Sequence, residues 1–515
     1  MKRLSVSYRA IALAFGLVLA TFVAGMPASA TPWSFGVMAD TQWSGSDPTG
    51  NNINSVAVNQ ILACNQAFVN AGVDFVVQVG DLTDNGSTAG LQTRLNANST
   101  LTAANIAFYG LRGNHEDTTT AKTFFQTNYI PTNNANTSVS VATDGISYSI
   151  THNNTKLLLL DILTADSTGA MDTATTWADS QLKAADHTQS FVFTHKNLLG
   201  QNHKDNEFGS SNDANPTQQN NFFSTLQNDG VRYVISGHDH IHHRSIVASP
   251  DGQHNLQEII CASDSYKYYT PSTPYSTRET PINQELGQTG YYIYTIDGPR
   301  VTVKYYSTTP LSNGDVPTNA AFSLRETFGY SLNGKEFLVA EGSFYTTVQD
   351  NYAGTFAKIL GGTNGNTAKT YDGRNLTKAV DTGWSDMTAN LASNILTLWG
   401  MSSALGSDLT DTYALSMSFD ASKVTDTNNF GLVTKNSNGI WVKGGTNFVS
   451  RAWQVGDVLG TYGVDLATNT AWAVVNRNGD FAVASNFASV PEPSALLALA
   501  SGCIGIVGLI TKRRN

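Results

Sequence analysis

Short apolar runs alternate with longer amphipathic stretches over residues 33–306. Short apolar runs of four to seven residues that end in polar residues predict strands, and stretches with helical periodicity predict helices. The first five elements follow a βαβαβ order, and later ones include antiparallel pairs, so the pattern indicates an α/β fold with mixed sheets. The predicted strands are 33–39, 73–79, 107–112, 147–151, 156–162, 191–194, 231–236, 291–296 and 301–306, and the predicted helices are 54–71, 91–106 and 177–185.

The pattern changes between about residues 320 and 489. This segment is rich in Gly, Asn, Thr and Ser between short alternating runs, and it contains no histidine. Three Asn-Gly pairs, at 333–334, 438–439 and 478–479, separate apolar runs and predict hairpin turns, because type I′ turns require positive φ at both central residues. We therefore expect a smaller all-β, sandwich-like domain over 320–489, after a first domain over 31–310.

The N-terminal segment 1–30 has the layout of a secretory signal peptide. Lys2, Arg3 and Arg9 precede an apolar run, which ends in small residues before Thr31. The sequence therefore predicts export, with cleavage before Thr31.

The C-terminal segment 490–515 combines Val490-Pro491-Glu492-Pro493, an uncharged stretch over 494–510 and a basic end. An uncharged stretch of this length predicts a short transmembrane helix with a cytoplasmic basic terminus. The segment resembles the PEP-CTERM sorting signals of exopolysaccharide-producing Gram-negative bacteria. The resemblance implies a sorting enzyme at the membrane, a transient inner-membrane anchor and a final place at the cell surface or in the extracellular matrix.

Composition excludes several classes of protein. The formal net charge is −10 and charged residues make up 14%, so no basic surface for nucleic acid is expected. Three cysteines in apolar runs do not form a disulfide framework. Since the chain is acidic, an anionic substrate requires local positive charge, such as a bound metal.

Five predicted strands in the first domain end in polar, chemically versatile residues. Because ligands bind outside the carboxyl ends of strands in α/β sheets, we expect these side chains to converge. A glycine precedes three of these five polar strand ends (the tips), and it is expected to let the chain turn sharply there: these are Gly80, Gly113 and Gly237. The tips are Asp40, Asp81, Asn114-His115, His195 and His238-Asp239-His240.

Carboxylate, amide and imidazole ligands without thiolate suit hard to borderline divalent metals. A shared carboxylate can hold two ions about 3.5–4 Å apart, the arrangement used in phosphoryl hydrolysis. The donor types therefore indicate a site for divalent metal ions.

These motifs, in this order, resemble the calcineurin-like metallophosphoesterase superfamily over residues 33–310. The resemblance implies an αββα sandwich of mixed sheets and hydrolysis of phosphate mono- or diesters by a hydroxide that bridges two divalent ions (Mn, Fe or Zn). It places Asp40, Asp81 and His240 on the first ion, and Asp81, Asn114, His195 and His238 on the second. In the superfamily the histidine at position 115 reaches the phosphate or the leaving group.

Two positions depart from the pattern. The family's first motif has a histidine where this chain has Gln42, whose amide oxygen is a weaker ligand for transition metals, so loss of the first ion or use of a harder ion such as Mn is expected. Asp84 stands where purple acid phosphatases have a tyrosine ligand, which disfavours that subgroup.

The remaining titratable residues are assigned structural roles. His242 and His243 are expected at the surface, with contacts behind the metal ligands as the alternative, and His203 is expected in a solvated loop, with contact to the substrate as the alternative. Glu116 is expected to orient its neighbours or to cap the next helix, and Asp161 to end a strand. Gln42 also supports an alternative from another class: a catalytically weak surface protein that associates with exopolysaccharide and uses the fold as a scaffold.

The sequences of the loops 200–217 and 263–290 do not indicate which substrate the protein would bind.

Overall fold

The computed structural model describes residues 31–162, 168–272, 276–332, 337–339, 344–346, 355–361, 369–371, 374–376, 378–388, 390–400, 409–424 and 426–485. The proposed signal peptide, the sorting tail and the Asn333-Gly334 pair lie outside the described residues. Within them, no helix has the length and apolar character needed to cross a membrane.

The first sheet has six strands. Its parallel part, β1-β2-β3, comes from the predicted βαβαβ segment, and three antiparallel strands extend it from β1. In spatial order the strands are β14 (Ser323–Ser331), β13 (Arg300–Thr308), β12 (Thr289–Asp297), β1 (Trp33–Met38), β2 (Phe75–Val79) and β3 (Ala107–Leu111).

The second sheet has eight strands and a parallel centre, because β6, β7, β8 and β10 run in the same direction. Antiparallel strands flank this centre on both sides. In spatial order the strands are β11 (Glu279–Glu285), β9 (His242–Ala248), β10 (Asn255–Ile260), β8 (Tyr233–Ser236), β7 (Gln189–Phe193), β6 (Thr155–Leu159), β5 (Tyr148–His152) and β4 (Thr137–Val141).

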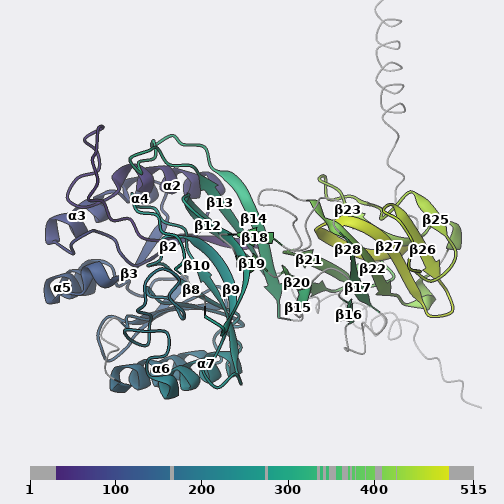
Figure 1. The fold of residues 1–515 in the computed structure, drawn as a ribbon, viewed down its shortest axis with the longest axis horizontal. Coiled ribbons are helices and arrows are strands. Elements are labelled where there is room, and N and C mark those ends of the chain that lie inside the picture. The colour runs from purple at the N-terminus through teal and green to yellow at the C-terminus, as the bar shows by residue number, and fades with distance from the viewer. Residues whose placement is uncertain are drawn as a thin grey trace, which may run out of the picture.

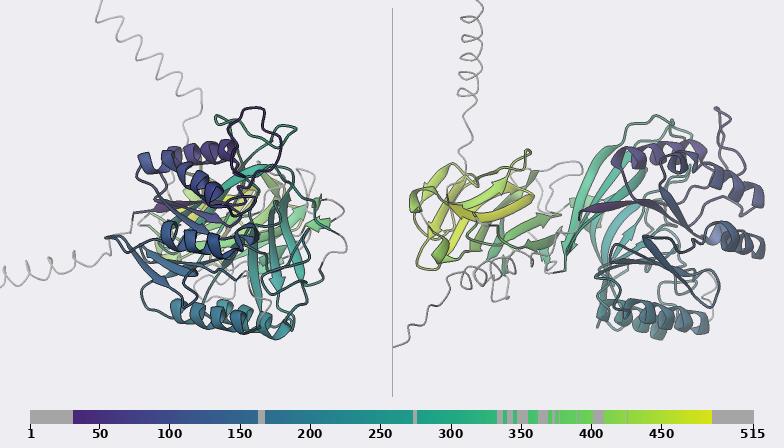
Figure 2. Two further views of the ribbon diagram at one scale, coloured as in Figure 1. Left: turned by 90° about the vertical axis from the view of Figure 1, so that its left-hand side faces the viewer. Right: turned by 180° about the vertical axis from the view of Figure 1, so that it is seen from behind.

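The two sheets pack face to face with helices outside (Figures 1 and 2). Alternate side chains of both sheets, such as Phe35, Phe75, Phe191 and Tyr294, form one buried cluster between them. Separate apolar clusters join the helices to the outer faces. The helices are α2 (Val58–Ala71), α3 (Thr88–Asn96), α4 (Ser99–Ala103), α5 (Thr119–Asn128), α6 (Thr168–Leu182) and α7 (Pro216–Asn228). The predicted αββα sandwich is confirmed.

The C-terminal part contains two further six-stranded sheets around a separate apolar cluster, as expected of a sandwich. One sheet runs β15 (Phe337–Val339), β20 (Lys378–Ser385), β21 (Ile395–Trp399), β28 (Gly479–Ser485), β23 (Phe430–Lys435) and β24 (Trp441–Lys443). The other runs β16 (Phe344–Thr346), β17 (Phe356–Gly361), β22 (Leu409–Ser418), β27 (Thr470–Arg477), β26 (Thr461–Asp465) and β25 (Asn447–Val449). A two-stranded ribbon joins β18 (Lys369–Tyr371) and β19 (Arg374–Leu376).

Three local predictions need correction. Strand β14 lies beyond the expected end of the first domain at 310 but pairs with β13. The helix expected over 91–106 is divided into α3 and α4, and Asn98, between them, accepts a hydrogen bond from the buried Arg94. The pair Asn438-Gly439 does join two adjacent strands, β23 and β24, but Asn478-Gly479 joins β27 and β28, which belong to different sheets.

The two parts meet at a buried ionic contact. Arg244 of β9 lies 3.0 Å from Glu326 of β14 and 3.3 Å from Asp381 of β20, and all three are buried. Arg244 therefore links both sheets of the α/β part to the β-rich part.

Candidate metal centre

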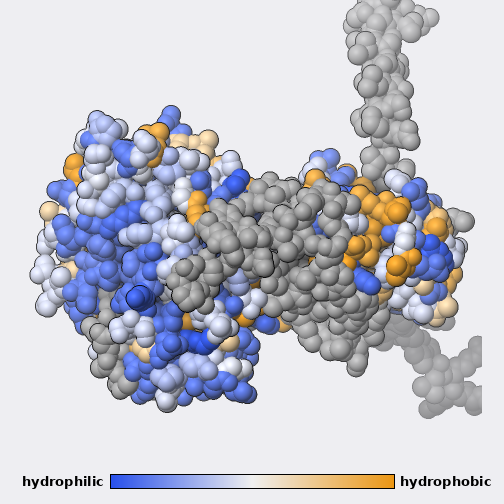
Figure 3. Space-filling model, in the orientation of Figure 1, coloured by the Kyte–Doolittle hydropathy of each residue, from blue (hydrophilic) through white to orange (hydrophobic). Residues whose placement is uncertain are grey.

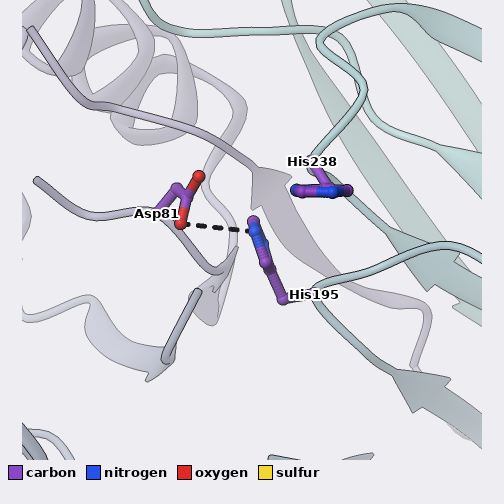
Figure 4. A group of neighbouring side chains, drawn as sticks. All are labelled: Asp81, His195 and His238. Carbon is purple, nitrogen blue, oxygen red and sulfur yellow. Dashed lines mark ion pairs between the residues drawn. The ribbon is translucent and has the colours of Figure 1, made fainter. Parts of the chain in front are cut away.

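The polar tips meet at the carboxyl ends of five strands. Asp40 follows β1, Asp81 follows β2, Asn114-His115 follows β3, His195 follows β7, and the His238–His240 turn follows β8. Figure 4 shows Asp81, His195 and His238 pointing toward one another. The side chains form two overlapping groups that share Asp81 and whose donor atoms lie within 4.8 Å of one another: Asp81, His195 and His238, and Asp40, Asp81 and His240.

In the group around His195, oxygen and nitrogen atoms that can bind a metal ion lie close to one another. His195 Nε2 lies 3.3 Å from Asp81 Oδ1 and 2.9 Å from Asn114 Oδ1. Its Nδ1 lies 3.1 Å from the carbonyl oxygen of Val79, which can only accept, so Nδ1 carries a proton and Nε2 faces the carboxylate. His238 Nε2 is buried and makes no hydrogen bond within the described residues, although Asp205 Oδ1 lies 3.5 Å away. This donor set fits a divalent cation.

The pKa values of His195 and Asp81 are shifted by this geometry. Burial alone lowers the pKa of His195, but the carboxylate of Asp81 outweighs it and raises that pKa to about 10. Burial alone raises the pKa of Asp81, and the charge and hydrogen bond of His195 bring it well below its ordinary value. Asp81 is therefore ionised, and its Oδ1 faces a positive charge. A metal ion can supply this charge in place of the proton on the His195 ring.

The group around His240 presents a neutral imidazole. His240 Nδ1 lies 2.9 Å from Ser263 Oγ and 3.1 Å from the carbonyl oxygen of Lys267. Burial lowers the pKa of His240 to about 3, so Nε2 carries a lone pair and faces Asp40 Oδ1 at 3.5 Å. Gln42 also reaches this group, because its Nε2 lies 2.9 Å from Asp81 Oδ2.

The backbone is strained at this edge of the sheets. Asp40, Asp81, His238 and His240 have φ values of 53°, 45°, 67° and 54°, in the left-handed region that side-chain-bearing residues seldom adopt. Such conformations cost on the order of 1–3 kcal/mol each and cluster at functional sites. Their concentration here indicates that side-chain direction, rather than stability, determines the local backbone.

The three glycines before the tips serve mainly to leave space. A Cβ on Gly80 would collide with the His195 ring, one on Gly113 with the Asp81 carboxylate, and one on Gly237 with Asp40 Oδ2. Of the three, only Gly80 also has positive φ, so the expected sharp turn holds there and close approach explains the other two.

His115 lies beside the centre and is a quarter exposed. Its Nδ1 lies 2.7 Å from the carbonyl oxygen of Asp84 and so donates there, while its Nε2 lies 3.8 Å from Asp81 Oδ2. Lys267 donates to Asp84 Oδ1 at 2.9 Å and adds a positive charge beside His115. His115 thus presents Nε2 toward Asp81 without taking part in either group of close donor atoms.

Supporting contacts hold the loops that carry these residues. Glu116 accepts hydrogen bonds from the backbone of Thr83 and Gly113, which confirms the expectation that it orients its neighbours. Burial and the charge of Asp81 raise the pKa of Glu116 to about 8. Asp161 follows β6 and pairs with Arg112 at 2.6 Å.

Two of the three histidines expected at the surface are buried. His242 and His243 are fully buried, where His242 contacts Tyr292 and Glu326, and His243 contacts Glu279. His203 packs its ring 4.2 Å from that of His238, and its Nδ1 lies 2.7 Å from Asp239 Oδ1. The His203 side chain is 31% exposed, and its contact with His238 forms across the loop that follows His195, a conformation with no local sequence pattern.

Residues 34–242 match the family model of the calcineurin-like phosphoesterases. The matched segment contains all seven proposed metal ligands and His115. The phosphoesterase match supports the superfamily and, with it, a hydrolase of phosphate esters. No curated protein matches the chain.

Solved structures of phosphatases are similar to part of this chain at low identity and low TM-score. A dimetal phosphatase from Danio rerio is 15% identical, with 53% of this chain and 95% of that chain covered and a TM-score of 0.34. PhoD is 12% identical, with 59% and 70% covered and a TM-score of 0.42. The purple acid phosphatase PPD1 from yellow lupin (Lupinus luteus) seeds is 12% identical, with 59% and 55% covered and a TM-score of 0.42.

Proposed function

We propose that this protein is a metal-dependent phosphoesterase that hydrolyses phosphate mono- or diesters. The observation that carries the proposal is the convergence of Asp81 Oδ1, Asn114 Oδ1 and His195 Nε2, with His195 Nε2 within 3.3 Å of both oxygens. Divalent ions bound there (Mn, Fe or Zn) would supply charge neutralisation at phosphorus and an activated water nucleophile. The dinuclear form implied by the superfamily uses the His240 group as well.

The chain's own residues would orient the substrate and move a proton. His115 donates from Nδ1 to the carbonyl oxygen of Asp84, so its Nε2 faces the centre, and in the doubly protonated ring Nε2–H could contact the phosphate or protonate the departing oxygen. Lys267, beside it, would attract an anionic ester to an otherwise acidic protein.

The test is a panel of phosphate monoesters and diesters, assayed with the metal-free full chain after addition of Mn, Fe or Zn separately. We expect metal-dependent turnover that His195→Gln abolishes and that His254→Gln, a change outside both donor groups, preserves. Equal activity of the two variants would contradict the proposed site, and absence of turnover with every metal and ester would favour the scaffold alternative. Gln42 is the feature that favours that alternative.

We also propose that the protein is exported and then sorted through its tail. The support is the three-part layout of 1–30 and the Pro-Glu-Pro, apolar and basic order of 490–515. Mass spectrometry of the mature protein should find an N-terminus at Thr31 and loss of the tail in a host that has the sorting enzyme. Retention of both ends would contradict this proposal.

A further inference from the structure

The two donor groups of the centre differ in what lies between their acceptor atoms. In the His195 group, Asn114 presents Oδ1, an electron-pair donor, to His195 Nε2 at 2.9 Å. In the His240 group, the Gln42 carboxamide presents Nε2, which carries two hydrogens, to Asp81 Oδ2 at 2.9 Å and to His240 Nε2 at 3.3 Å. In the His195 group the His195 ring itself faces these oxygens, and a metal ion can take the place of its proton, whereas the His240 group contains an additional hydrogen-bond donor, the Gln42 amide.

The orientation of the Gln42 amide follows from its neighbours. Asp81 Oδ2 belongs to a carboxylate and accepts only. His240 Nε2 also accepts, because Nδ1 uses its proton for the carbonyl oxygen of Lys267, which has no hydrogen to give. If Gln42 turned its Oε1 toward these two atoms, three electron-pair donors would face one another, so the amide nitrogen must face them.

The other end of the amide supports this assignment. Gln42 is fully buried, and its Oε1 has no hydrogen-bond partner among the described residues. Leaving a buried acceptor unpaired is costly, so the two N–H contacts must outweigh the loss at Oε1. The N–H groups satisfy the acceptors that a cation at the first position would otherwise satisfy.

We propose that the Gln42 carboxamide closes the first metal position by donating to Asp81 and His240, so that the centre holds one divalent ion, at the position formed by Asp81, Asn114, His195 and His238. This inference rests on the proposed function and replaces its dinuclear form with a mononuclear one. An ion at the first position would have to turn the amide and break both hydrogen bonds before gaining a weak amide-oxygen ligand.

The experiment measures bound metal instead of turnover. The metal-free full chain is loaded with Mn²⁺, freed of excess and analysed for metal content and by electron paramagnetic resonance. We expect one equivalent and an uncoupled signal for the wild-type chain. Gln42→His should hold two equivalents with a spin-coupled signal, because two ions that share a carboxylate lie about 3.5–4 Å apart. Gln92→His, an exposed change on α3, is the matched control and should hold one.

A second pair of variants keeps the test decisive if Gln42→His fails to fold. His240→Gln should retain the single equivalent, whereas His195→Gln should lose it. Two coupled ions in the wild-type chain, or one ion in both wild type and Gln42→His, would overturn the inference and leave the phosphoesterase proposal standing. Loss of the ion in His240→Gln but not in His195→Gln would also overturn it. Absence of bound metal in every variant would instead overturn the proposed function.

Discussion

The buried acids in and around the metal centre and the described acids of the β-rich part lie in different surroundings. At the centre, Asp40 and Asp81 face histidines and each other, and the buried acids Glu116, Glu207 and Glu258 each have a pKa raised to about 8, with burial as the largest cause. Described carboxylates of the β-rich part with shifted pKa values face hydrogen-bond donors or cations, which lower the pKa: Ser422 beside Asp420, Arg451 beside Asp457, and Thr397 and Arg300 beside Asp480.

The surfaces of the two parts differ as well. The face of the α/β part seen in Figure 3 is mostly hydrophilic, whereas apolar residues gather on the β-rich part. Large apolar side chains exposed there include Phe448, Val455, Val458 and Leu466. Buried acids with raised pKa values therefore surround the proposed site, whereas Asp480 and Asp381 of the β-rich part face cations, including Arg300 and Arg244 of the α/β part.

The largest effect is expected from Asp81→Asn. The change removes the carboxylate shared by both donor groups, so metal and phosphoesterase activity should both fall to the background of the assay. The matched change in the β-rich part is Asp480→Asn, which weakens contacts to Arg300 and Lys435 at 3.4 and 3.0 Å but touches no proposed ligand. It should leave metal content and activity unchanged. Loss of activity in both variants to the same extent would contradict the assignment of catalysis to the α/β part alone.

His115→Asn should keep the metal and lower turnover by roughly 10²–10⁴, the usual contribution of a positioned acid or base. The loss should be greatest for esters with poor leaving groups, since an activated nitrophenyl ester departs without a proton. Steady-state kinetics on both types of ester, with metal analysis of the same samples, checks this. Equal losses on both would assign His115 to electrostatic contact with the phosphate, and loss of metal would make it a ligand.

Stability should depend on pH through the buried acids of the α/β part. Glu258 has a folded-state pKa of about 8 and an ordinary value of 4.5, because burial disfavours its charge. A raised pKa contributes stability that is complete below about pH 4.5 and is lost as the pH rises through about 8. Between these values each such group changes the free energy of unfolding by up to about 1.4 kcal/mol per pH unit.

Denaturant unfolding of the metal-free chain from pH 5 to 8.5 measures this slope. Glu258→Gln keeps a side-chain acceptor for the backbone N–H of Leu198 and removes the titration, so the slope should become shallower. An unchanged slope would mean that Glu258 is ionised in the folded protein.

Removal of the β-rich part should have the smallest effect on catalysis. The fragment 31–332 retains both sheets of the sandwich, whereas a fragment that ends at 310 loses β14 and with it Glu326, the partner of Arg244. We expect the longer fragment to retain activity within a few-fold of the full chain, measured on the same ester. An inactive but folded 31–332 fragment would show that the β-rich part completes the site.

Much of this picture could be predicted from local patterns. Apolar runs that end in polar tips locate β1, β2, β3, β7 and β8, and the spacing of the tips brings the seven proposed ligands to one edge. Long-range pairing could not be predicted: β14 joins the first sheet, and Asn478-Gly479 crosses between sheets. The burial of His242 and His243 depends on partners at Glu326 and Glu279, far along the chain, so their sequence neighbourhood gives no signal.

The central claim is that Asp81, Asn114, His195 and His238 hold a divalent ion. Crystals of the full chain grown with Zn²⁺, measured at the zinc absorption edge, test it most directly. The account predicts an anomalous peak about 2.0–2.2 Å from His195 Nε2 and Asp81 Oδ1, the usual range for zinc–nitrogen and zinc–oxygen bonds. A peak only at the His240 side, or no peak at this edge of the sheets at full zinc loading, would contradict it.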